Sequence, residues 1–147
     1  METGIDAHYS VLRKELHENN DTVPISKLAP TGWHVPSDAE WTTLINYLGG
    51  ITAGGEMKSI GTIEAGTGLW ITPNTGATNE SGFTALPSGF RFNYGTFYDL
   101  SYSDSFWSST EASLTNAWGF YLNHDSSNMG WNNGSKLFGV SVRCLKD

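Results

Sequence analysis

The sequence predicts an α+β fold, in which a helix comes first along the chain and an antiparallel sheet follows. Three observations support this prediction: a capped amphipathic pattern after Pro36, a region rich in Gly, Pro, Asn and Thr at residues 54–82, and alternating apolar residues beyond it. The chain has 147 residues and 38% apolar content, which suffices for one hydrophobic core but not comfortably for two. We therefore expect one domain, at residues 29–147, after a separate segment at residues 1–28.

The clearest helix signal lies directly after Pro36. Ser37 is placed to cap the helix, and Glu40, three residues later, completes a capping box. Gly49-Gly50 supplies the left-handed backbone that commonly ends a helix. Between these signals, apolar residues recur at helical spacing at Trp41, Leu44, Ile45 and Leu48. We expect a helix with one buried face.

Residues 1–28 have a different character from the rest of the chain. Apolar side chains fall at helical spacing at Ile5, Tyr9, Leu12 and Leu16, with charged residues between them. This spacing predicts a short amphipathic helix. Such a helix is a candidate for packing on the domain or for mediating an oligomer.

Beyond residue 54 the chain is expected to form a long ordered loop region, anchored by Trp70, and then a sheet. The apolar period changes to two after Gly82, which is typical of strands. The expected strand pieces are Phe83-Thr84-Ala85-Leu86, Phe90-Arg91-Phe92, residues 117–122 around Trp118, Phe120 and Leu122, and residues 140–145 around Val140, Val142 and Cys144.

Charge and hydropathy exclude several kinds of partner. Fifteen acidic against eight basic residues give a net charge of −7, which repels the phosphates of nucleic acids and anionic lipid surfaces. No apolar run approaches the ~20 residues that a membrane-spanning helix needs, so we expect no membrane insertion. The N-terminus lacks the pattern of a signal peptide, but a chain that starts after a cleaved leader would look the same. The compartment therefore stays open.

Five segments carry a family resemblance: residues 30–41 (PTGWHVPSDAEW), 53–58 (AGGEMK), 79–91 (NESGFTALPSGFR), 106–111 (FWSSTE) and 140–144 (VSVRC). In this order they resemble the Fibrobacter succinogenes major paralogous domain, which occurs in many surface proteins of gut-associated bacteria. The resemblance covers about residues 29–147. It implies a C-type-lectin-like fold, shared with formylglycine-generating enzymes, with a twisted antiparallel sheet, flanking helices and long ordered loops. It also implies an exported, cell-surface or virion-associated protein.

The chain departs from this family at its cysteines. Ala29 stands where the family usually has a cysteine, which the resemblance implies would pair with the C-terminal one. Cys144, the single cysteine, therefore lacks that partner. Because Cys144 alternates with Val140 and Val142, we expect a buried, inert thiol rather than the reactive cysteine that formylglycine-generating enzymes use with copper.

A lectin-like fold raises calcium-dependent sugar binding as an alternative. Such a site needs carboxylate and amide oxygens that converge at about 2.4 Å on one cation, usually from a Glu-Pro-Asn or Gln-Pro-Asp loop and a Trp-Asn-Asp strand. Neither loop triplet occurs, and Trp131-Asn132-Asn133 only loosely echoes the strand. The remaining acidic donors are scattered, at Asp99, Asp104, Glu111 and Asp125. We expect no cofactor, with calcium as the less favoured alternative.

No pattern in the chain indicates catalysis. The four histidines show no metal-binding pair; we expect His34 to be structural, held by a loop carbonyl, and His124 to be at most a ligand contact. The Ser-rich run after Trp107 lacks a nucleophile elbow. Its hydroxyls can bond to neighbouring backbone groups, while Phe106 and Trp107 fill the core. We therefore expect no enzymatic activity.

Residues 102–136 are the expected binding region. They are rich in Tyr, Trp, Ser, Asn and Asp and contain a single basic residue, Lys136, a composition close to that of antibody-like binding surfaces. An ordinary polar β region is the alternative interpretation. The candidate ligand contacts are Tyr102, Ser103, Asp104, Thr115, Asn116, Tyr121, Asn123, Asp125, Asn128, Trp131 and Asn132. Trp131 and Tyr121 would be the aromatic contacts.

The same region resembles the variable region of proteins diversified by retroelements, in which polar positions vary between fixed residues. Trp107, Trp118 and Gly119 would be the fixed frame here. We expect a non-enzymatic module that binds a protein or a carbohydrate on a cell surface, and the resemblance implies a diversified receptor-binding protein of gut bacteria or phage. The alternatives are an assembly domain of a surface or phage fibre and, less favoured, an enzyme of the formylglycine-generating type.

Overall fold

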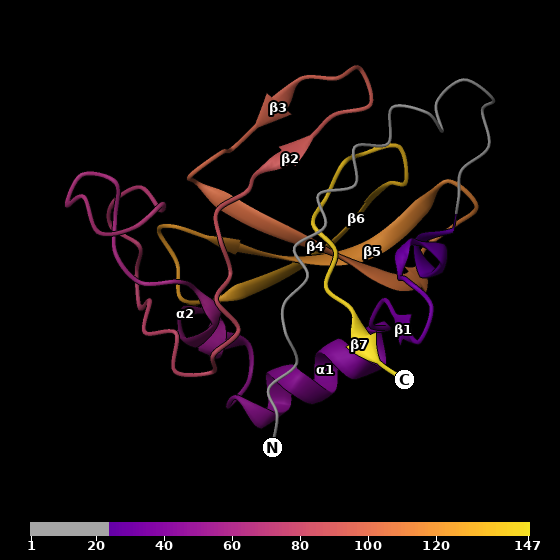
Figure 1. Ribbon diagram of the computed structural model, residues 1–147, viewed down its shortest axis with the longest axis horizontal. Helices are drawn as coiled ribbons and strands as arrows, with labels where there is room; N and C mark the ends of the chain where they lie inside the picture. The colour runs from indigo at the N-terminus through magenta and orange to yellow at the C-terminus, as the bar shows by residue number, and fades with distance from the viewer. Residues whose placement is uncertain (1–23) are drawn as a thin grey trace.

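A three-stranded antiparallel sheet forms the centre of the domain, in a computed structural model that describes residues 24–147 (Figure 1). Its strands are β4 (Ser103–Glu111), β5 (Asn116–Asn123) and β6 (Met129–Ser135), paired in that order. The mixture of helix and antiparallel strands confirms the predicted α+β class. The helix α1 (Asp38–Tyr47) and the β2–β3 hairpin lie on opposite sides of this sheet in Figure 1.

Short elements complete the fold. The hairpin consists of β2 (Phe90–Arg91) and β3 (Phe97–Tyr98), and the two ends of the described chain meet where β1 (Trp33–His34) pairs with β7 (Leu145–Lys146). The remaining elements are the 3-10 helices η1 (Ile25–Leu28) and η2 (Ile51–Ala53) and the one-turn helix α2 (Gly54–Met57). The amphipathic helix that we predicted near the N-terminus lies outside the described residues.

Helix α1 forms as its sequence predicts. The Ser37 side chain accepts a hydrogen bond from the Glu40 backbone N–H, and the Glu40 carboxylate accepts one from the Ser37 backbone, so the capping box is present. The helix ends before Gly49 and Gly50, whose φ angles are 100° and 98°. Its apolar face buries Trp41 and Ile45 against the sheet.

The sheet separates two apolar clusters. The larger one packs Trp41 of α1 against Phe106 and Phe120, whose rings are stacked with centroids 5.1 Å apart. The smaller one joins Trp107 of β4 to Ile25 and to other residues near the chain ends. Phe106 and Trp107, neighbours on one strand, therefore fill different clusters, as the alternation of side chains along a strand requires.

The run that follows Trp107 has the structural role that we expected. The hydroxyl of Ser108 accepts a hydrogen bond from the backbone N–H of Thr110 at 3.1 Å. The hydroxyl of Thr110 in turn accepts one from the backbone N–H of Asp38, at the first turn of α1. These bonds hold an irregular stretch of β4, where the register with β5 shifts between Trp107 and Glu111.

Two buried side chains anchor the long loop region between α2 and β2. Trp70 is fully buried, as predicted, and its indole N–H lies within hydrogen-bond distance of the Ser59 hydroxyl and the Ala85 carbonyl. The second anchor, Lys58, was not predicted. Its ammonium donates to the carbonyls of Asn123 and Ser126 at 3.0 and 2.9 Å, and burial lowers its pKa to about 8. The loop region is thus tied to the core and to the β5–β6 turn.

Two of the predicted strands are wrong. Residues 83–86 contribute only an isolated bridge at Ala85, and residues 140–144 only one at Ser141; the C-terminal strand β7 begins at Leu145. The alternation at 140–144 reflects packing, because Val142 enters the smaller cluster while the backbone meets β4 only at Ser141. Burial on alternate sides does not require a hydrogen-bonded ladder.

Candidate functional site

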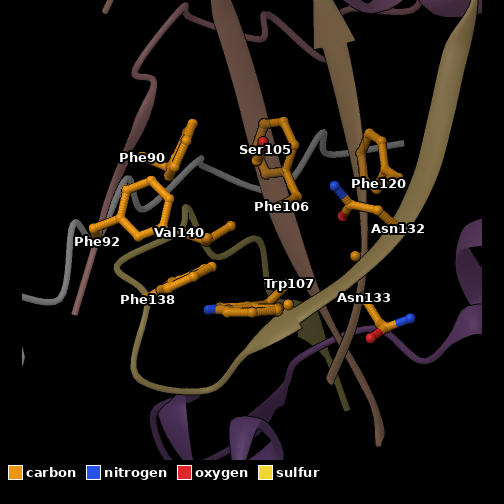
Figure 2. A pocket seen from close by; sticks show the side chains of 12 residues that line it. Phe90, Phe92, Ser105, Phe106, Trp107, Phe120, Asn132, Asn133, Phe138 and Val140 are labelled. Atoms are coloured by element: carbon orange, nitrogen blue, oxygen red, sulfur yellow. The ribbon is translucent and has the colours of Figure 1, made fainter. Parts of the chain in front are cut away.

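A pocket of about 210 Å³ opens between the β2–β3 hairpin and the central sheet (Figure 2). Aromatic residues dominate its wall, and none of the lining residues within 24–147 carries a charge. The lining residues are Phe90, Phe92, Ser105, Phe106, Trp107, Gly119, Phe120, Asn132, Asn133, Gly134, Phe138 and Val140. Pockets that bind drug-sized ligands usually exceed roughly 300 Å³, so this one is suited to a single small group.

The wall on the hairpin side is a set of mutually packed rings. Phe92 contacts Phe90 and Phe138 with ring centroids 5.3 and 4.7 Å apart. Tyr94 stacks on Phe92 at 5.2 Å, and the hydroxyls of Tyr94 and Tyr98 lie 3.0 Å apart. Edge-to-face and offset contacts of this kind favour fixed ring positions. The wall is therefore preformed.

The register of the sheet decides which side chains form the floor. Trp107, Gly119 and Asn132 lie side by side on neighbouring strands and share one face. In Figure 2 the Asn132 amide points toward the aromatic wall, whereas the Asn133 side chain points away. The Asn133 amide oxygen accepts a hydrogen bond from Asn116 at 3.1 Å.

The side chains of Ser105, Tyr121 and Asn132 lie on one face of the sheet; Ser105 and Asn132 line the pocket, and Tyr121 lies beside it. Ser105 is paired with Tyr121, and Asn132 lies two residues beyond Gly130, the partner of Tyr121 on β6. The Tyr121 ring lies across Gly130, where a Cβ would clash with it. Within residues 24–147, the side chains of Ser105, Tyr121 and Asn132 make no hydrogen bond. No other group of the described residues competes with water or a ligand for these three side chains.

The predicted contact residues do not form one site. Thr115 and Asn116 lie at one end of β5, whereas Asn123 lies at the other. The eight residues of β5 rise about 3.3 Å each, which separates these ends by roughly 23 Å. The Asn123 end also holds Tyr102, Asp125 and Asn128.

Trp131 and Asn132 are neighbours in sequence but lie on opposite faces of the sheet. Trp131 is paired with Phe120 and contacts its ring at a centroid distance of 5.9 Å, on the side of the larger cluster. It is 39% exposed. Of the eleven predicted contacts, Asn132 lines the pocket and Tyr121 lies on the same face beside it. Trp131 does not belong to this group.

Two of the predicted contacts are corrected by their burial. Ser103 is 7% exposed and Asp104 is 2% exposed, so neither offers a side chain to a ligand at the surface. The Asp104 carboxylate accepts hydrogen bonds from the hydroxyls of Ser88 at 2.6 Å and Ser141 at 3.3 Å. Asp104 thus links three segments that are distant along the chain. Its polar sequence neighbours had suggested a surface position, but they do not show the two serines that enclose it.

Asp104→Asn should remove part of the pH dependence of stability. Burial raises the pKa of Asp104 to about 7, against the opposing hydrogen bonds from Ser88 and Ser141 and the attraction of Arg143. The folded state thus holds this proton more tightly than the unfolded chain, where the pKa of aspartate is about 3.9. The stability from the protonated group is complete below about pH 4 and is lost as the pH rises through about 7.

The measurement is the urea midpoint of the full chain between about pH 5 and pH 8. We expect the midpoint of the wild type to fall over this range and that of Asp104→Asn to fall less, since the amide stays neutral. The control is His34→Gln. Hydrogen bonds to Asp147 and Glu40 raise the pKa of His34, so this residue also makes stability fall as the pH rises. Identical profiles for the wild type and Asp104→Asn would contradict the prediction.

The other titratable residues considered above have structural environments. His34 is held by two carboxylates, Asp147 at 2.7 Å and Glu40 at 2.9 Å, and not by the loop carbonyl that we expected. His124 lies 3.0 Å from the carbonyl oxygen of Thr72. Cys144 is half-buried, and burial raises the pKa of its thiol, which disfavours the reactive thiolate.

The scattered acidic residues do not converge. Glu111 pairs with the buried ammonium of Lys136 at 2.7 Å, while Asp104 is enclosed by hydroxyls. No group of three or more His, Cys, Asp or Glu side chains that could hold a metal ion occurs within residues 24–147. In the same part of the chain, no helix has the length and apolar content needed to cross a membrane.

The aromatic wall was missed as part of a site. Phe90 and Phe92 were assigned only to a strand, and Phe138 was not considered. A signal was present, because five aromatic residues fall between positions 90 and 98, and several of them cannot all be buried in a two-stranded hairpin. Three large side chains of this hairpin region are strongly exposed: Tyr94 at 66%, Phe97 at 63% and Leu100 at 69%.

Comparison with known proteins identifies one family. The Fibrobacter succinogenes major domain matches residues 9–146, which confirms the resemblance drawn from the five sequence segments. The match starts within the predicted N-terminal segment. No curated protein and no solved structure matches the chain.

Proposed function

The chain belongs to the Fibrobacter succinogenes major domain family, and for this member we propose a non-enzymatic function: it binds a neutral ligand in the pocket between the β2–β3 hairpin and the sheet. One observation carries the proposal. A preformed wall of packed rings faces the Asn132 amide, which has no hydrogen-bond partner within the described residues. A mostly apolar pocket with a few convergent polar groups is the usual form of a small-ligand site.

The chemistry of the pocket supports binding rather than catalysis. Among the described residues, its lining includes the hydroxyl of Ser105 but no His, Asp, Glu, Lys, Arg or Cys that could activate it. Nucleophilic and acid–base catalysis both require such a group within hydrogen-bond reach. An enzyme of the formylglycine-generating type is also disfavoured by the raised pKa of the Cys144 thiol.

The ligand in this proposal is a group of a protein or a carbohydrate on a cell surface. Loops and hairpins on a rigid sheet are the usual carriers of binding residues. We further propose a C-type-lectin-like fold for residues 29–147, supported by the β1–β7 pairing at the chain ends and by the long ordered loop between α2 and β2.

An assembly domain of a surface or phage fibre is the second candidate. It is favoured by the exposed side chains of Tyr94, Phe97 and Leu100, which lie in or next to the β2–β3 hairpin. Contiguous exposed apolar residues commonly mark contacts with another protein. Size measurement of the full chain and of a chain without residues 1–28 distinguishes this candidate from a monomeric binding module.

Diversification by a retroelement stays a proposal for the polar positions around Tyr121 and Asn132. Both lie on the pocket face, while Trp107 and Gly119 form its floor. This arrangement fits a diversified protein, in which fixed residues form the frame and variable residues make the contacts. Ser103 and Asp104 are buried, so the proposal no longer includes them among the variable contacts. Absence of a near-identical template repeat and of a reverse transcriptase gene in the surrounding DNA would remove this proposal.

Gly134→Ala should weaken binding about tenfold, or about 1.4 kcal/mol, because its methyl group enters the pocket. An added Cβ would lie 3.4 Å from Phe138 and 3.6 Å from Trp107, which are ordinary contacts, so the fold should be kept. The measurement is retention of the full chain on arrays of glycans and of bacterial surface proteins.

Two exposed residues provide controls for this experiment. Tyr47→Ala changes a side chain that is 86% exposed on α1, across the sheet from the hairpin, and should leave retention unchanged. Trp131→Ala tests the opposite sheet face. If Trp131→Ala abolishes retention while Gly134→Ala has no effect, the ligand binds on that face and the pocket proposal is wrong.

A further inference from the structure

We infer that the ligand of this pocket is a neutral pyranose ring, bound without a metal ion through the side chains of Ser105, Tyr121 and Asn132. This inference rests on the proposed function and specifies its ligand class. It follows from the number of free polar groups on the pocket face, from the size of the pocket and from the absence of charge in its lining.

The spacing of the polar groups fits a ligand with several hydroxyls. Ser105 and Tyr121 are directly opposed across β4 and β5, which places their Cβ atoms roughly 5 Å apart. Tyr121 and Asn132 are diagonal neighbours across β5 and β6, at roughly 7–8 Å. The Tyr121 ring crosses Gly130 toward β6, so its hydroxyl lies over the strand that carries Asn132. The three groups together form one polar patch.

These groups exceed what an aromatic amino-acid side chain could satisfy. A tyrosine or tryptophan side chain offers one polar atom, which would leave two of the three groups covered without a partner. Covering an unpaired polar group costs about 1–3 kcal/mol, so such a ligand would lose part of the affinity that it gained from the aromatic wall. A pyranose ring offers several hydroxyls that both donate and accept.

The aromatic wall suits the other side of the same ligand. A pyranose ring has an apolar face of C–H groups, and Phe90, Phe92 and Phe138 provide flat apolar surface opposite the polar patch (Figure 2). A cavity of about 210 Å³ is suited to one monosaccharide unit rather than to a longer chain. The ligand would therefore be a terminal or side-branch residue of a glycan.

Charge limits the ligand to neutral sugars. None of the lining residues that the structure describes carries a charge, and the whole chain has a net charge of −7. An anionic sugar would lose its hydration in this pocket without gaining an opposite charge. Uronic and sialic acids are thus disfavoured relative to hexoses and N-acetylhexosamines.

The test is an NMR titration of the full ¹⁵N-labelled chain in EDTA. The probes are the methyl glycosides of glucose, galactose, mannose and N-acetylglucosamine, with p-cresol as a mimic of a tyrosine side chain. At least one glycoside should shift the Asn132 side-chain amide signals. Asn132→Leu keeps the side-chain size and should weaken that glycoside about tenfold, while p-cresol binding changes less than about twofold.

Asn46→Leu is the matched control, because it makes the same change at an exposed residue of α1, across the sheet from the hairpin. It should leave glycoside binding unchanged. If p-cresol binds in the pocket and no glycoside does, the ligand class is wrong while the proposed function stands. If neither binds, both are wrong. Glycoside binding that requires calcium, or that survives Asn132→Leu unchanged, overturns the inference.

Discussion

Trp70→Ala should lower the free energy of unfolding by about 3–5 kcal/mol, as expected for a fully buried tryptophan. Trp70 has no exposed surface, and its indole N–H bonds to Ser59 and Ala85 at 3.1 and 3.2 Å. Truncation would leave a cavity in the larger cluster and release the loop region that this residue anchors. Chemical denaturation monitored by circular dichroism measures this decrease in the free energy of unfolding.

Two variants separate the contributions of the Trp70 side chain. Trp70→Phe keeps much of the ring but removes the donor, and should lose about 1–2 kcal/mol, because the Ala85 carbonyl then lacks that bond. Trp131→Ala makes the same truncation at a side chain that is 39% exposed, and should lose clearly less than Trp70→Ala. Equal losses for Trp70→Ala and Trp131→Ala would show that Trp70 is not an anchor.

Gly89→Ala should lower the free energy of unfolding by roughly 2–5 kcal/mol and disrupt the pocket as well. The φ angle of Gly89 is 62°, a left-handed conformation that disfavours a side chain. An added Cβ would also clash with the carbonyl oxygen of Tyr98 on β3. Because Gly89 precedes β2, relief of this clash must move the hairpin that forms the aromatic wall.

Gly82→Ala is the matched control for the clash. Gly82 has a similar φ of 69°, but no atom of the described residues lies within 4 Å of an added Cβ. It should therefore lose only about 1 kcal/mol, the cost of the left-handed backbone alone. The difference between the two variants measures the close approach of Gly89 to the backbone at the end of β3. A loss at Gly82 as large as that at Gly89 would contradict this explanation.

Local signals predicted helix α1 and the Trp70 anchor correctly. The capping box of Ser37 and Glu40, the apolar stripe through Trp41, and the Gly49-Gly50 stop all lie within 14 residues of chain. Helix hydrogen bonds join residues four apart, so the information for a helix is contained in the segment itself. A large apolar residue such as Trp70 within a polar loop has few alternatives to burial.

Strand pairing was harder to predict because a strand needs a partner. Residues 140–144 alternate as a strand does, yet the backbone meets β4 only at Ser141. Asp104 lies among polar residues in sequence but is enclosed by Ser88 and Ser141, which come from segments far away along the chain. Neither result is visible in the residues that surround these positions.

The family, the α+β class, helix α1 and the polar, aromatic character of residues 102–136 could all be predicted from the amino-acid sequence, because these properties depend on composition and on local spacing. Which of those residues share a surface depends instead on how the strands pair. Asn132 faces the pocket and Trp131 the opposite side, because side chains alternate along β6 and its register with β5 sets which face each one takes. The wall of Phe90, Phe92 and Phe138 exists only because chain folding brings distant segments together.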